Sequence, residues 1–175
     1  MKTSEPGTDM TSQFLKFSRA LLLDECWPRL RSCVESLSEE QLWWRPNEAS
    51  NSVGNLLLHL DGNVRQWIVT SFSGAKDQRN RTAEFAVKGA VTKNELIERL
   101  GKTLQEAAAV LARLTEAELT ATRTIQNHTI TGMGAIYHVV EHFAMHYGQV
   151  LYITKLLKAE NLGFYRELDK TERLP

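Results

Sequence analysis

Three histidines recur at every fourth residue near the end of the chain, at His138, His142 and His146. In an α-helix a step of four residues advances about one turn, so these imidazoles are expected on one stripe of a helix surface. Adjacent members of such a stripe can bind the same metal ion. His138 and His146 cannot share an ion, because eight residues of helix rise about 12 Å whereas zinc–nitrogen bonds are about 2.0–2.1 Å long.

The chain has two further histidines, His59 and His128. His59 lies in the apolar segment 53–60, which is predicted to be a buried helix, whereas His128 lies in a polar loop and is predicted to be exposed. A lone histidine in an apolar helix is commonly a hydrogen-bonded core residue. Combined with an adjacent pair from the ladder, His59 would instead complete a three-histidine metal site, because one ion satisfies all three imidazoles. The alternative for the ladder is a partly solvated stripe that binds water, Glu141 or carbonyl groups.

The charge balance argues against nucleic acid or an anionic membrane surface as a partner. The 175 residues include 21 basic and 21 acidic side chains, which cancel. This length is typical of a single domain that folds without a disulfide. Cys26 and Cys33 lie in one predicted helix about 10 Å apart along its axis, too far for a disulfide, and are predicted core residues.

No stretch of the sequence has the pattern of a signal peptide or of a membrane span. The first nine residues are largely polar, and no window approaches the roughly 20 apolar residues that a transmembrane helix needs. We therefore expect a cytoplasmic protein.

Four long helices are predicted to position the histidines. Apolar residues recur at helical spacing over residues 11–37, 52–72, 92–114 and 133–158. Pro28 is expected to kink the first of these helices, because proline lacks an amide donor and crowds the preceding turn.

Short segments between the long helices also carry signals. Residues 37–42 and 114–119 each contain a serine or threonine followed three residues later by glutamine or glutamate, which predicts a capped short helix. Residues 73–91 lack helical periodicity and are long, which favours a crossover along the bundle. Residues 122–131 predict a small hairpin or an extended loop.

These elements predict an all-α protein, a four-helix bundle with a long crossover between the second and third helices. The bundle is expected to form a single domain over residues 11–160. Residues 1–10 are predicted to be a flexible N-terminus, and residues 161–175 a C-terminal extension.

Two motifs carry a family resemblance. They are His138-Val-Val-Glu-His142-Phe-Ala-Met-His146-Tyr-Gly-Gln149 and the earlier Leu-Leu-Leu-His59-Leu-Asp-Gly-Asn63. In order and spacing they resemble the DinB-like (DNA-damage-inducible) metal-binding four-helix proteins, which share a superfamily with bacterial thiol-dependent S-transferases. The resemblance extends from about residue 12 to residue 158. It implies an up-down-down-up arrangement of the helices and a homodimer.

The same resemblance implies the ligands and the ion. It assigns His59, His142 and His146 to a divalent metal ion, nickel or zinc first, with iron or manganese as alternatives. His138 would then lie one turn away from the ligands.

Polar residues near these ligands in the sequence are candidates to support them. They are Asn63, Gln149, His138, Glu141 and Asp61. Asn63 and Gln149 have the better helical spacing, one turn after His59 and three residues after His146. Their alternative role is a hydrogen bond that packs two helices together. The Trp43-Trp44-Arg45 corner is predicted to shape the mouth of a pocket.

Three protein nitrogens leave at least one coordination position open, which is typical of catalytic metal sites. Water or a low-molecular-weight thiol could occupy it and become a nucleophile near neutral pH. The sequence therefore predicts a metal-dependent enzyme, a thiol-dependent transferase or a hydrolase that acts on a small substrate. The alternative is a non-catalytic dimeric bundle that binds a metal ion or a small molecule.

Overall fold

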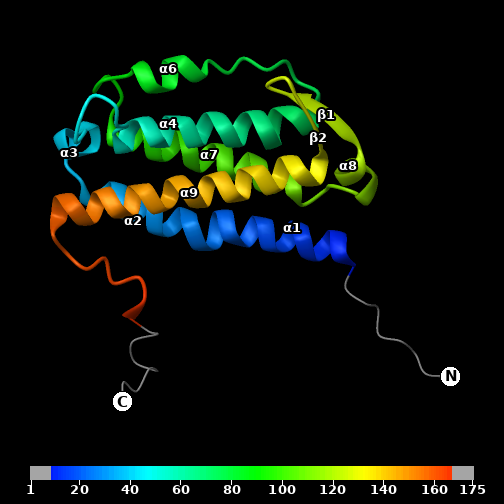
Figure 1. Ribbon diagram of the computed structural model, residues 1–175. Helices are drawn as coiled ribbons and strands as arrows, with labels where there is room; N and C mark the ends of the chain where they lie inside the picture. The colour runs from blue at the N-terminus through cyan, green and yellow to red at the C-terminus, as the bar shows by residue number, and fades with distance from the viewer. Residues whose placement is uncertain (1–8, 167–175) are drawn as a thin grey trace.

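The computed structural model describes residues 9–166, and four long helices of this part of the chain form a bundle (Figure 1). The bundle elements are α1 (Met10–Ala20), η1 (Leu21–Cys26) and α2 (Trp27–Ser36), which form the first long helix; α4 (Val53–Val64), η2 (Arg65–Thr70) and α5 (Ser71–Ser73), which form the second; α7 (Lys93–Leu111); and α9 (Gly132–Lys158). The connecting elements are α3 (Glu39–Trp43), α6 (Arg81–Ala86), α8 (Glu116–Thr120), β1 (Thr122–Ile125) and β2 (His128–Thr131). The predicted four-helix bundle is confirmed.

The long helices run up, down, down and up. In Figure 1 the first helix runs toward α3, the second runs back, α7 runs parallel to the second, and α9 returns. Hydrogen bonds fix both ends of α7. At its start the Lys93 Nζ donates to the Leu37 carbonyl over 2.7 Å, and just beyond its end Arg113 donates to the Phe72 carbonyl over 3.4 Å. The parallel second and third helices therefore require the long crossover.

Capping boxes begin α3, α4, α7 and α8. In each box a serine or threonine hydroxyl and a side chain three residues later bind each other's free backbone N–H groups. The pairs are Ser38 with Gln41, Ser52 with Asn55, Thr92 with Glu95, and Thr115 with Glu118. Both predicted short helices are confirmed.

The first long helix is continuous through Pro28. A π-helical segment, η1, ends two residues before the proline. A π-helical turn contains an additional residue and shifts the register of the backbone carbonyls.

Leucines from the first three long helices pack with Phe143 and other apolar residues of α9 to form the core, and Leu22, Leu57 and Leu100 are fully buried. Cys26 and Cys33 are free and buried, as predicted. Burial, the main cause, raises the pKa of Cys26 to about 11. These thiols therefore belong to the core.

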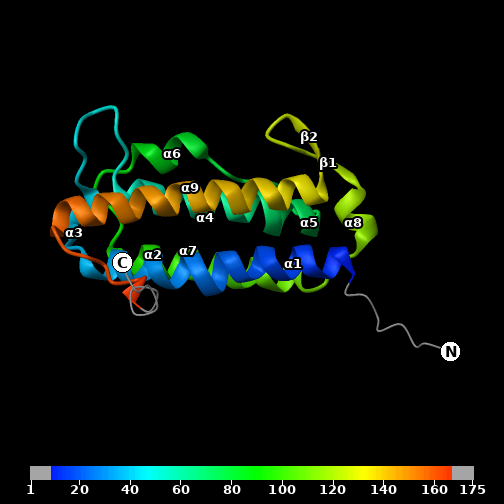
Figure 2. The same ribbon diagram turned by 60° about the horizontal axis from the view of Figure 1, so that its bottom comes forward.

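The crossover contains a helix, α6, that the sequence did not predict. Its six residues make fewer than two turns, so no periodicity could reveal it. Asn55 of α4 anchors it, because the Asn55 Nδ2 donates to the carbonyls of Glu84 and Val87, each over 3.0 Å. As a result α6 lies along the outside of α4 (Figures 1 and 2).

A two-stranded hairpin, one of the two alternatives predicted for residues 122–131, leads into α9. Strands β1 and β2 pair antiparallel, with Thr122 opposite Thr131. Gln126 and Asn127 form the turn, both with positive φ.

Asp9 caps α1 through its side chain. Of the predicted N-terminal segment, residues 1–8 lie outside the described residues, as do residues 167–175 of the predicted C-terminal extension. Among the described residues, no helix combines the length and the apolar character needed to cross a membrane.

Candidate metal centre

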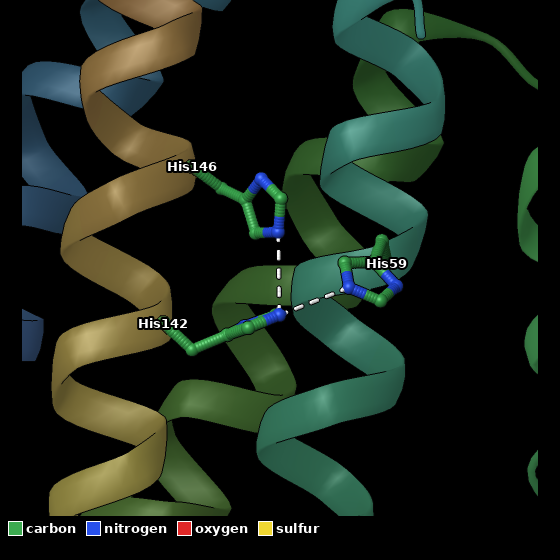
Figure 3. Close-up of side chains that lie close together, drawn as sticks. All are labelled: His59, His142 and His146. Carbon is green, nitrogen blue, oxygen red and sulfur yellow. Dashed lines mark hydrogen bonds between the residues drawn. The ribbon is translucent and has the colours of Figure 1, made fainter.

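Three histidine side chains from two neighbouring helices converge at the middle of the bundle. His142 and His146 lie one turn apart on α9 and project toward His59 on α4 (Figure 3). The Nε2 of His142 lies 3.1 Å from the Nε2 of His59 and 3.2 Å from the Nε2 of His146. The potential ligand atoms of the three side chains all lie within 4.8 Å of one another. Two histidines spaced four residues apart on α9 thus converge with one histidine on α4.

The Nδ1 atoms of His59 and His146, which face away from the cluster, make hydrogen bonds to acceptors. The Nδ1 of His59 donates to the Glu84 Oε2 over 2.9 Å, and the Nδ1 of His146 donates to the Gln149 Oε1 over 2.8 Å. A neutral imidazole carries one proton, so donation from Nδ1 leaves a lone pair on Nε2. Both Nε2 lone pairs therefore face the centre of the cluster.

His142 lies between the other two rings and its Nε2 faces both. One ring nitrogen cannot make a hydrogen bond to each of two unprotonated nitrogens, because it has a single in-plane proton or lone pair. Burial, and then the nearby His146 and His59 rings, lower the pKa of His142 to about 3. The arrangement therefore favours three neutral imidazoles, the form that binds metals.

A buried ion pair from the crossover supports His59. Arg79 binds both carboxylate oxygens of Glu84, with its Nε 2.7 Å from Oε1 and its Nη2 3.0 Å from Oε2. Burial alone would raise the pKa of Glu84, but hydrogen bonds from His59 and Arg79, together with the Arg79 charge, lower it overall. Glu84 is therefore an anionic acceptor that fixes the proton on the His59 Nδ1.

The Glu84–Arg79 ion pair can lie against α4 because Gly62 has no side chain. A Cβ at this position would lie 2.1 Å from the Glu84 Oε1 and 2.8 Å from the Arg79 Nε. Any larger residue would displace the ion pair from the helix surface.

The two nitrogen–nitrogen distances from His142 fit ligands of one metal ion. With metal–nitrogen bonds of about 2.1 Å, two ligands separated by 90–110° have nitrogens roughly 2.9–3.4 Å apart. The distances of 3.1 and 3.2 Å from His142 fall in this range. His59 is buried, His142 and His146 are half-buried, and Gln149 is exposed, so the cluster is accessible from solvent.

A protein-family model described as "Protein of unknown function (DUF1572)" matches residues 9–166. The chain belongs to this family. A search of curated proteins gives no match to this DUF1572 chain.

Solved structures of DinB-like proteins have the same fold as this DUF1572 protein. A conserved protein from Enterococcus faecalis has 14% identity and a TM-score of 0.65, over 90% of this chain and 100% of its own. The DinB-like protein YjoA from Bacillus subtilis has 19% identity and a TM-score of 0.64, over 87% and 96% of the two chains. A DinB-like protein from Bacillus cereus has 13% identity and a TM-score of 0.63, over 80% and 91%. These structures confirm the predicted DinB-like fold.

In this DUF1572 protein Gln149 supports the cluster, whereas Asn63 has the alternative role, a hydrogen bond between two helices. Gln149 contacts a histidine of the cluster, as expected. Asn63 instead contacts His138, with the Asn63 Nδ2 3.3 Å from the His138 Nε2. The His138 ring stacks on Trp67, with 4.2 Å between the ring centroids. Asn63 and His138 thus form a separate polar contact one turn away.

The two carboxylates predicted from sequence proximity do not support the cluster of this DUF1572 protein. Asp61 points to α7, where Arg99 and Thr103 donate to its carboxylate. Glu141 is exposed on α9. Sequence analysis missed Glu84 and Arg79, because they lie in the crossover, 25 and 20 residues from His59, in a segment without a recognisable pattern.

Proposed function

We propose that this protein is a metal-dependent enzyme in which His59, His142 and His146 bind one divalent ion. The observation that carries the proposal is the convergence of three Nε2 atoms, two of which have lone pairs fixed by Glu84 and Gln149. Nickel and zinc suit a site of neutral imidazoles.

Each residue has a distinct part in this proposal. The three histidines hold the ion and leave at least one coordination position free for a small molecule. Glu84 and Gln149 orient two of the rings and increase the basicity of their Nε2 atoms. The half-buried position of His142 and His146 lets a small molecule approach from the α9 side.

The reaction that fits this site is activation of a small nucleophile, either water or a thiol. A bound divalent ion supplies charge that lowers the pKa of a coordinated water and deprotonates a coordinated thiol. We favour a thiol-dependent transferase, because the fold resembles that of the DinB-like proteins and the histidine motifs resemble a superfamily that includes S-transferases. A hydrolase is the second form of the same proposal.

Cobalt substitution tests the open position. The protein loaded with cobalt should show a visible spectrum, and added azide, imidazole or a small thiol should each change it. A thiol should also add a thiolate-to-metal charge-transfer band. A change with azide but not with thiols would favour a hydrolase over a transferase.

A cobalt spectrum that none of the three compounds alters would contradict the enzyme proposal. It would show a closed site and would favour the non-catalytic bundle. Failure to bind cobalt, nickel or zinc at all would contradict the metal site itself.

A further inference from the structure

We propose that an apolar hollow beside the histidine cluster binds the uncharged, apolar or aromatic part of the small substrate. This inference rests on the proposed function, because it assumes that the reacting group of the substrate binds the metal ion. It specifies the chemical class of the part of the substrate that lies beside the ion.

The hollow lies one helical turn from the ligands. It has a volume of about 340 Å³ between the loop that follows α3 and the C-terminal half of α9. Leu56, three residues before His59, and Gln149, three residues after His146, both line it. Three residues of helix rise about 4.5 Å, so one small molecule can span the hollow and the ion.

Gln149 joins the two sites directly. Its Oε1 accepts from the Nδ1 of His146 over 2.8 Å, and the same side chain forms part of the wall of the hollow. The hollow therefore adjoins the side chain that orients one ring of the cluster.

The lining selects an uncharged group. Among the described residues that line the hollow, none carries a charge at neutral pH. Trp44, Tyr152 and Leu156 form apolar walls, yet they are 38%, 65% and 56% exposed. Large apolar side chains gathered around a concave surface are typical of small-molecule sites. The volume is at the lower end of the range for such sites, about 300–1,000 Å³, and suits a single ring or a short aliphatic chain.

A larger hollow nearby does not have this character. It occupies about 460 Å³ between α4, the crossover and α7, and seven of the 16 residues in its wall are charged. Arg65, Arg79 and Arg99 in this wall are already paired with Glu106, Glu84 and Asp61. Glu84 and Arg79, which support His59, form part of this wall, and none of the three histidines does.

Two thiols that share a metal-binding atom test the inference. Phenylmethanethiol carries an aromatic ring, and ethanethiol carries only a methyl group beyond the same carbon. Their dissociation constants are measured by the charge-transfer band of the full-length cobalt-loaded protein. We expect phenylmethanethiol to bind about tenfold more tightly, the effect of removing about half of a phenyl surface from water.

Variants of the wall show where the ring binds. Ala49→Trp should fill the hollow and Tyr152→Ala should remove one wall, and both residues are exposed, so folding should be retained. The ratio of the two dissociation constants should fall toward one in both variants. Ala117→Trp, the same substitution at an exposed alanine of α8 at the other end of the bundle, should leave the ratio unchanged. Comparing ratios cancels the difference in acidity between the thiols.

Several results would overturn the inference. If both thiols bind equally well to the cobalt protein, the site exists but the hollow does not contribute. If the preference persists in Ala49→Trp and Tyr152→Ala, the ring binds elsewhere. If the preference disappears as the protein concentration rises, a second copy of the chain covers the hollow. Failure to load cobalt would instead refute the proposed function, and this inference with it.

Discussion

At the scale of single residues, the position of His142 between two other imidazoles determines how the cluster responds to acid. Its pKa is lowered from 6.5 to about 3 in the folded protein, mainly by burial. The unfolded chain therefore binds a proton between these pH values that the folded, metal-free protein does not bind. Stability consequently falls as the pH decreases below about 6.5.

We predict that the chelated protein loses thermal stability between pH 7 and pH 5.5. The pKa values of His146 and His138 are also lowered, chiefly by burial, and act in the same direction. Melting temperatures measured across this range should decline, and His142→Gln should decline less steeply. Equal slopes for the two proteins would show that His142 does not titrate as described.

The choice of ligands is tested by metal content. His59→Ala, His142→Ala and His146→Ala should each lose most of the bound divalent ion, because each removes one of three converging nitrogens. His138→Ala is the matched control and should retain the ion, since His138 contacts Asn63 and Trp67 instead. Loss of the ion in His138→Ala, with retention in His146→Ala, would mean that the other adjacent pair binds it.

At the scale of elements, α4 and the crossover together position His59. Substitution of Gly62, where α4 meets the crossover, tests this contact. Gly62→Ala should weaken metal binding about tenfold or more, because the new Cβ displaces the Glu84–Arg79 pair that orients His59. Glu84→Gln should give a loss of similar size. Metal affinity is measured by competition with a chromophoric chelator.

Gly148→Ala on α9 is the matched control for Gly62→Ala, because it makes the same substitution in a long helix. A Cβ at Gly148 meets no atom within 4 Å, so alanine should increase stability by up to about 1 kcal/mol through its higher helix propensity. Thermal unfolding should show a higher melting temperature and unchanged metal affinity. Metal affinity in Gly62→Ala equal to that of the wild type would contradict the role assigned to the crossover.

The difference between predictable and unpredictable elements has a physical basis. The four long helices follow from apolar periodicity and capping boxes, and Gln149 follows from its distance to His146 along one helix. Glu84 reaches His59 through a tertiary contact made by a six-residue helix, and local sequence patterns do not encode such contacts. The orientation of Asp61 toward α7 likewise depends on which helix packs on which face.

At the scale of the whole molecule, the core should be sufficient for folding without an ion. All four long helices contribute buried apolar side chains to one core, whereas in a zinc finger the metal replaces a core. We predict that chelation leaves the helical circular dichroism signal intact and lowers the melting temperature, because an ion that binds only the folded state stabilises it. Collapse of the helical signal would show a structural role for the metal site.

The two π-helical segments, η1 and η2, affect how this protein should be aligned with its relatives. A π-helical turn corresponds to a one-residue insertion in an α-helix. Relative to an uninterrupted α-helix, each segment therefore shifts every later residue of its helix by one position. Where a protein of the same fold has an uninterrupted α-helix, the correct alignment needs a single-residue gap near residues 21–26 or 65–70. A gap-free alignment would match buried positions with exposed ones on one side of each segment and would understate the similarity between the sequences.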